Sequence, residues 1–153
     1  MRRFKSLLVA LIGLTALLYA LQGLASVDDM RMQAEAARGD AFRDTLLSGS
    51  PAASWAGFAL ITLCQFVIAA VAFKGAWDLY AARNATDAEY KEAKSLAIWA
   101  GGLSLLLWFA LSLMIGAGLF QWGSDFGAIA LTRAFQLGST SALTILFVNG
   151  VRD

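Results

Sequence analysis

The chain has 153 residues, enough for one domain; 59% are hydrophobic, only 15% are charged, and the mean hydropathy is +0.64. A soluble domain usually carries about a quarter charged residues, and a chain this short has too much surface to hide so many apolar side chains from water. The composition therefore excludes an ordinary soluble domain and predicts an integral membrane protein. The formal net charge of +1 is too small to indicate a nucleic-acid partner.

Four apolar, charge-poor stretches have the length that a helix needs to cross about 30 Å of hydrocarbon. Lipid offers no partner for backbone amide and carbonyl groups, so each stretch must be helical. We predict helices at about residues 6–26, 52–80, 87–119 and 127–149. The connections are too short for a parallel crossover. The predicted fold is therefore an all-α, four-helix bundle with up–down topology, a single membrane domain over residues 1–153.

The first stretch also resembles the start of a secretory signal peptide, because MRRFK precedes the apolar run. The apolar core of a signal peptide usually has about 7–15 residues, and the run from Leu7 to Ala25 is longer. The triplet Gly23-Leu24-Ala25 offers only a weak cleavage site. We therefore expect an uncleaved membrane anchor.

Basic residues are unevenly distributed between the two ends of the predicted helices. Three lie on the side away from the termini, namely Arg31, Arg38 and Arg43. Eight lie on the side that holds both termini: Arg2, Arg3, Lys5, Lys74, Arg83, Lys91, Lys94 and Arg152. Cytoplasmic loops carry an excess of lysine and arginine, so we expect both termini in the cytoplasm of a multi-pass membrane protein.

Two connections have recognisable local patterns. Thr86 and Glu89 have the spacing of a capping box, which predicts that the third helix begins near Asp87. The outer loop, residues 27–51, contains apolar residues at helical spacing with charges between them. We predict a short amphipathic helix on the outer surface there, with a disordered loop as the alternative.

Arg133 is the most informative side chain, because it lies about six residues inside the fourth predicted helix, about 9 Å below its outer end. An intramembrane charge costs several kcal/mol unless it is paired or reaches the interface. One interpretation is that Arg133 extends outward to lipid phosphate or pairs with Asp125 or Asp44. The other is a polar site with Gln136, on the same helix face, and Gln65, although a glutamine in a membrane helix more often joins helices.

Small residues recur where helices could touch. They permit close backbone approach, but they do not distinguish a contact inside the bundle from a face that binds a partner. The sets at helical spacing are Ala100 with Ser104, Ala130 with Ala134, and Gly138 with Ala142, beside the pairs Gly101-Gly102 and Gly116/Gly118.

The residues that are missing from the chain argue against an enzyme. With no histidine and a single cysteine, Cys64, there is no credible zinc, iron–sulfur or histidine-ligated haem site. No Ser–His–Asp or Cys–His set and no glycine-rich phosphate loop is present. We expect no catalytic activity and no cofactor.

The stretch GAWDLYAARNATDAEYKEAKSLAIWAGGLSLLLWF, residues 75–109, is followed by a Gly–aromatic–Trp segment at 118–122 and by GAIALTRAF at 127–135. These residues resemble the bacterial predicted small integral membrane proteins grouped as domain of unknown function 2165. The resemblance implies four membrane helices and no assigned activity. Arg133 matches the arginine of the family's fourth-helix segment, whereas Gln65 stands where an acidic residue is usual. The family's outer-loop histidine is absent here, and Gly123-Ser124-Asp125 follows Trp122 in place of the usual Gln-Ser.

Two classes of function remain open. The first is a non-catalytic accessory or scaffold subunit that packs against a larger membrane complex, which the small-residue faces and the low intramembrane polarity favour. The alternative is a small transporter or channel for an anionic solute, with Arg133, Gln136 and Gln65 along its path. Four helices enclose little space, so the alternative requires self-association. Membrane lipid is the only partner that both share.

Overall fold

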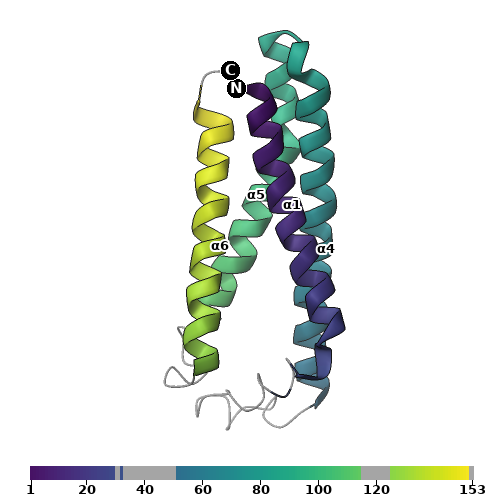
Figure 1. Cartoon of the computed structure of the whole chain (residues 1–153), viewed down its shortest axis with the longest axis vertical. Helices are drawn as coiled ribbons and strands as arrows, with labels where there is room; N and C mark the ends of the chain where they lie inside the picture. Colours follow the sequence, from purple (N-terminus) through teal and green to yellow (C-terminus); the bar gives the residue numbers. More distant parts are fainter. Residues whose placement is uncertain (30–31, 33–50, 115–124, 152–153) are drawn as a thin grey trace.

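The computed structural model describes residues 1–29, 32, 51–114 and 125–151. In this part of the chain the secondary structure is entirely helical, which confirms the predicted all-α class (Figure 1). The elements are α1 (Arg2–Ala25), α4 (Pro51–Ala81), the short 3-10 helix η1 (Ala82–Asn84), α5 (Asp87–Met114) and α6 (Asp125–Gly150). The predicted surface helix at 27–51 and the predicted end of the third helix near 119 lie largely outside the described residues.

Three of the described helical segments are long and apolar enough to cross a membrane: Arg2–Ala25, Trp55–Asn84 and Asp87–Ser112. Only 28% of the residues in the apolar window of each segment are buried inside the molecule. On α1, for example, Leu7, Leu14 and Leu18 are 54%, 44% and 56% exposed. Apolar surface on this scale requires lipid or further helices around it. α6 has the length of a span, but Arg133 and Gln136 interrupt its apolar sequence and it is outside this set.

Helices that follow one another in the chain pack side by side and antiparallel (Figure 1). The Ser6 hydroxyl of α1 donates a hydrogen bond to the Ala76 carbonyl of α4 at 2.7 Å, while Gly23 near the other end of α1 lies beside Phe58. α5 packs on both α4 and α6, and α1 makes smaller contacts with α5 and α6. Figure 1 shows both termini at one end of the molecule, with α6 diverging from α1 and α4 toward the other end.

One glycine allows close approach at each of these three helix contacts. A Cβ on Gly13 of α1 would lie 3.1 Å from the Ala72 Cβ of α4, and one on Gly75 of α4 would lie 2.7 Å from the Ala97 backbone nitrogen of α5. A Cβ on Gly101 of α5 would lie 2.5 Å from the Ile145 Cγ1 of α6. A side chain at Gly75 would meet backbone and force α4 and α5 apart, whereas at Gly13 and Gly101 the nearest atoms belong to the side chains of Ala72 and Ile145, which would have to shift.

The small residues of α5 and α6 belong largely to the contact between these two helices. The Ser104 and Ser141 hydroxyls form a buried hydrogen bond of 2.8 Å across it. Ala100 and Ala134 are buried, at 0% and 3% exposure, and a Cβ on Gly138 would lie 3.6 Å from the Trp108 Cβ. These small residues therefore pack against other helices of the same molecule. For these positions, the contact inside the bundle is the correct interpretation, and the partner-binding face is not.

The end that holds the termini has the best-packed core. Tyr90 and Leu79 are fully buried there, together with Val9 and Val148. The Lys5 ammonium is also buried, and it donates a hydrogen bond of 2.6 Å to the Val151 carbonyl after α6. Because α1, α4, α5 and α6 all contribute, this core holds the two diverging helix pairs together.

The turn between α4 and α5 confirms the predicted capping box. The Glu89 carboxylate accepts hydrogen bonds from the Thr86 backbone N–H at 2.9 Å and from the Thr86 hydroxyl at 2.8 Å. The Glu89 N–H donates to the Thr86 hydroxyl at 3.4 Å. These bonds satisfy amides that a helix start leaves without partners, so α5 begins at Asp87, as predicted.

Candidate functional site

The candidate site is the exposed face of α6 that carries Arg133 and Gln136, near the end of the molecule opposite the termini. Another face of α6 is buried through Ala134, Ser141 and Val148, and α5 is the helix against which α6 mainly packs. The exposed face carries polar residues three or four positions apart, which places them along one side of the helix. These residues are Thr132, Arg133, Gln136 and Thr140, all of them exposed.

The two threonine hydroxyls bond to their own helix. Thr132 donates to the Ala128 carbonyl at 2.9 Å, and Thr140 donates to the Gln136 carbonyl at 2.5 Å. Such back-bonding satisfies a hydroxyl locally, in apolar surroundings as well. The Arg133 guanidinium and the Gln136 amide are therefore the polar groups on this face that remain available to another molecule.

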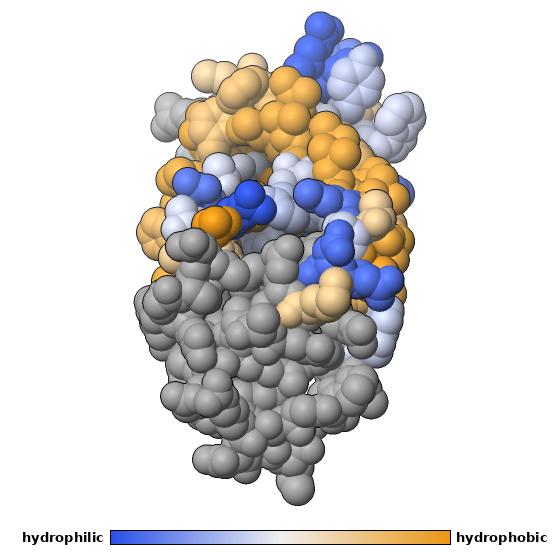
Figure 2. All heavy atoms as spheres, turned by 60° about the horizontal axis from the view of Figure 1, so that its bottom comes forward, coloured by the Kyte–Doolittle hydropathy of each residue, from blue (hydrophilic) through white to orange (hydrophobic). Residues whose placement is uncertain are grey.

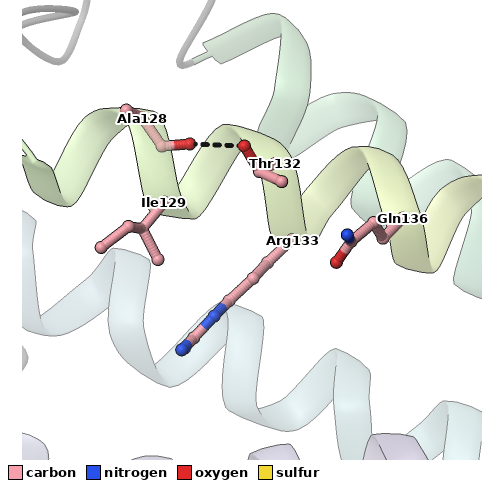
Figure 3. Close-up of a pocket in the computed structure, with 5 residues that line it drawn as sticks. All are labelled: Ala128, Ile129, Thr132, Arg133 and Gln136. Atoms are coloured by element: carbon pink, nitrogen blue, oxygen red, sulfur yellow. Dashed lines mark hydrogen bonds between the residues drawn. The ribbon is translucent and has the colours of Figure 1, made fainter.

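Arg133 and Gln136 line a shallow pocket of about 340 Å³ together with Ala128, Ile129 and Thr132. Figure 3 shows the Arg133 side chain extended away from the axis of α6, with the Gln136 amide on the same side of the helix. Arg133 lies eight residues after the start of α6, about 12 Å along the helix axis. Within the part of the chain that the structure describes, no hydrogen bond or ion pair reaches its guanidinium.

Large apolar side chains are also exposed on α6. Ile129, at 52% exposure, lines the pocket with Arg133, whereas Phe135 and Leu143, at 70% and 65%, are outside the pocket lining. Figure 2 shows the same end of the molecule turned forward, where hydrophilic residues gather around a hollow and hydrophobic surface borders them. An arginine set in exposed apolar surface can bind a carboxylate or a phosphate through two parallel N–H···O bonds.

Gln65, the third residue of the predicted polar site, does not line this pocket. It is 6% exposed and shares the buried face of α4 with Thr62, which is 7% exposed. A Cβ on Gly23 of α1 would lie 3.9 Å from the Thr62 hydroxyl, so this face of α4 packs against α1. The structure thus places Gln65 in a helix contact and leaves Arg133 and Gln136 together on α6.

The proposed ion-pair partners of Arg133 cannot be placed. Asp44 lies outside the described residues, and the side chain of Asp125 is likewise outside them, although its backbone begins α6. Pairing of Arg133 with either carboxylate stays a prediction.

A second polar site was missed by reasoning from sequence. Arg2, Arg3 and Arg83 were used there only to predict orientation, yet they line one pocket at the end with the termini. Arg2 and Arg83 are 81 residues apart in the chain, and no motif connects them. The sequence contained only one indication of this pocket, namely three arginines at helix ends that adjoin each other.

The comparisons with known proteins point to one family. A family model for predicted small integral membrane proteins matches residues 1–150. No curated protein and no solved structure matches the chain. The match covers all the described helices, and their exposed apolar surface agrees with its description. The chain therefore belongs to the family of predicted small integral membrane proteins, domain of unknown function 2165.

Proposed function

We propose that this protein is a non-catalytic accessory subunit of a larger complex in the bacterial inner membrane, and that it docks through the exposed face of α6 that carries Arg133. The observation that carries the proposal is Arg133. It is exposed, has no partner within the described residues and sits among exposed apolar side chains of a membrane protein. A partner helix that brings a carboxylate to Arg133 would neutralise this unpaired charge.

The physical argument rests on the cost of leaving an arginine unpaired in lipid, which is several kcal/mol near the middle of the membrane. A carboxylate on a partner helix would accept two hydrogen bonds from the planar guanidinium, a geometry that a lysine cannot reproduce. Gln136, one turn further along, adds an amide that can bond to the same partner. Ile129, which lines the pocket with Arg133, supplies apolar contact area beside the ion pair.

The proposal includes four membrane spans with up–down topology and both termini in the cytoplasm. The antiparallel contact of α6 with α5, a candidate span, supports α6 as the fourth, and the basic residues at the end with the termini support the orientation. In this topology Arg133 lies in the outer half of the membrane. On intact spheroplasts, an Ala88→Cys variant should resist an impermeant thiol reagent, and it should react after permeabilisation. Asp28→Cys should react under both conditions. The reverse pattern would contradict the orientation.

An alternative is a path for an anionic solute through Arg133, Gln136 and Gln65. Such a path needs all three side chains in one channel. The burial of Gln65 in the contact between α4 and α1 separates it from the pocket of the other two. The geometry therefore favours docking over transport.

The docking proposal is tested by native co-purification of the chain at its chromosomal expression level in a mild detergent. The wild-type protein should recover a stoichiometric membrane partner, and Arg133→Gln should recover at least tenfold less of it. Arg133→Lys should give an intermediate recovery, since it keeps the charge and loses the paired geometry. Lys91→Gln, an exposed cation at the other end, is the matched control and should change nothing.

A wild-type chain that purifies alone would contradict docking, and so would full recovery of the partner by Arg133→Gln. Misfolding is excluded as a cause if Arg133→Gln keeps the wild-type unfolding midpoint. We expect that result, because Arg133 makes no polar contact within the described residues. Exchanging the two charges should restore recovery of the partner. In this experiment Arg133→Glu is combined with a partner variant in which an arginine replaces the carboxylate residue.

A further inference from the structure

Three arginines meet in a pocket at the end of the molecule that holds the termini, far from Arg133. The pocket has a volume of about 350 Å³ and is lined by Met1, Arg2 and Arg3 of the α1 start and by Arg83 and Asn84 of η1. Its walls thus come from two segments that are distant in the sequence. No carboxylate is among these lining residues.

Arg2 is committed to holding the pocket together. Its guanidinium donates to the Ala85 carbonyl at 2.7 Å, forms an ion pair with Asp87 and lies 4.5 Å from the centre of the Tyr90 ring. These contacts fasten the start of α1 to the turn between η1 and α5. Arg2 therefore acts as a positioning residue, and the negative charge of Asp87 is neutralised by Arg2.

Arg83 is held in place by contacts that use only part of its guanidinium. Its Nη1 donates to the Tyr80 carbonyl at 2.8 Å, and its guanidinium lies over the Tyr80 ring, 4.2 Å from the centroid. Its Nε–H is buried and makes no hydrogen bond within the described residues. Its Nη2 also makes no hydrogen bond there, which leaves N–H donors of the guanidinium for a ligand. Because the side chain is already fixed, little entropy would be lost on binding.

Arg3 adds a charge that nothing in the described part of the chain neutralises. It is exposed and takes part in no hydrogen bond or ion pair there. Among the described residues, Asp87 is the carboxylate that pairs with these three guanidiniums, and it is bound to Arg2. The excess positive charge and the planar arginine donors match a phosphate oxyanion, whose oxygens accept from several donors at once.

The pocket also lies where a lipid headgroup would be. The apolar segment of α1 begins beside it and that of α4 ends beside it, and the tilted rings of Trp77 and Tyr80 of α4 lie near it with centroids 6.4 Å apart. Both rings are exposed, at 66% and 43%. Exposed tryptophan and tyrosine at a helix end are typical of the membrane–water interface. Basic pockets between helix ends at this level bind anionic headgroups.

We infer that this pocket binds a phosphate group, carried by an anionic phospholipid or free in solution, with Arg3 and Arg83 as its ligands and Arg2 positioning them. The inference is independent of docking through α6, because the two sites lie at opposite ends of the molecule and share no residue.

The test is a titration of the purified full-length chain, in a neutral detergent, with short-chain phosphatidylglycerol, short-chain phosphatidylcholine and inorganic phosphate. Calorimetry should show saturable binding of phosphatidylglycerol at least tenfold tighter than that of phosphatidylcholine. Arg83→Lys, which keeps the charge and removes the planar guanidinium donors, should raise the dissociation constant about five- to tenfold. Arg3→Gln should raise it similarly, while Lys91→Gln, an exposed cation outside the pocket, should change it less than twofold.

The two phosphate sources are distinguished by inorganic phosphate. If inorganic phosphate binds as tightly as phosphatidylglycerol, the natural ligand is a soluble phosphate. If inorganic phosphate binds much more weakly, the natural ligand is the lipid. Both results agree with a phosphate site. Equal affinity for the two lipids together with no binding of inorganic phosphate would overturn the inference. So would an equal loss of affinity in Lys91→Gln, since that indicates diffuse charge attraction. If Arg83→Lys unfolds, Arg3→Gln decides alone, because Arg3 makes no polar contact that folding requires.

Discussion

Gly75→Ala should lower the free energy of unfolding by about 1–3 kcal/mol, the usual cost of overpacking a closely packed contact. The new Cβ would lie 2.7 Å from the Ala97 nitrogen, 2.9 Å from the Leu96 carbonyl carbon and 3.0 Å from the Ala97 Cα. All three are backbone atoms, which cannot rotate away as the end of a side chain can. Relief requires α4 and α5 to move apart. The effect is measured by reversible unfolding in mixed detergent, followed by far-ultraviolet circular dichroism.

Gly102→Ala is the matched control for this prediction. A Cβ on Gly102 would meet no atom within 4 Å, although Gly102 also lies inside a helix. Alanine is favoured over glycine in a helix interior by about 0.5–1 kcal/mol, so this variant should be as stable as the wild type or more stable. Destabilisation of the same size in both variants would mean that α4 and α5 are not in the described contact.

Tyr90→Ala should be the most damaging single truncation at the end with the termini, costing about 3–5 kcal/mol, the range for removing a buried aromatic ring. Tyr90 is fully buried, the Arg2 guanidinium lies 4.5 Å from its ring centroid and the Lys94 ammonium 5.2 Å. Removing the ring leaves a cavity and takes a cation–π surface from two partly desolvated cations. The same unfolding measurement checks the cost.

Tyr90→Phe separates the contribution of the ring from that of the hydroxyl. It keeps the buried ring with its contacts to the Arg2 guanidinium and the Lys94 ammonium, and it removes the hydroxyl, which donates to the Arg2 carbonyl at 3.4 Å. We expect Tyr90→Phe to cost well under half as much as Tyr90→Ala. Equal costs for the two variants would show that the hydroxyl, and not the packed ring, stabilises this end.

The positions of the helices could be predicted because lipid imposes length and backbone satisfaction on each apolar stretch. The capping box at Thr86 and Glu89 also gave the start of α5 correctly, since both partners lie within one turn. The start of α1 differs: it was predicted near residue 6 and lies at Arg2. The reason is that basic side chains at a membrane surface extend into the headgroups and do not end the helix.

Which faces touch could not be predicted. Residues that face lipid and residues that face another helix are both apolar, so the sequence of a membrane helix carries little signal about its rotation. Gly75 and Gly102 look alike in the sequence, yet Gly75 lies against backbone and Gly102 against nothing within 4 Å.

The candidate site was predicted in part, for the same reason. Arg133 stood out because a charge in an apolar stretch is rare, and Gln136 followed from helical spacing. Gln65 was grouped with them as a polar residue of the second helix, but the rotation of α4 turns it toward α1. The pocket of Arg3 and Arg83 depends on the packing of α1 beside η1, which no local pattern encodes.

The central claim, docking through the exposed face of α6 that carries Arg133, is tested most directly by photo-crosslinking in native membranes. A photoreactive amino acid at Ile129, which is 52% exposed and lines the pocket with Arg133, should give a discrete protein adduct. The adduct should map to a membrane segment of the partner with an aspartate or glutamate within one helical turn, and it should vanish in Arg133→Gln. The same probe at Leu63 of α4, which is 61% exposed, should give lipid adducts alone. Lipid adducts alone at Ile129, or a protein adduct that persists in Arg133→Gln, would contradict the account.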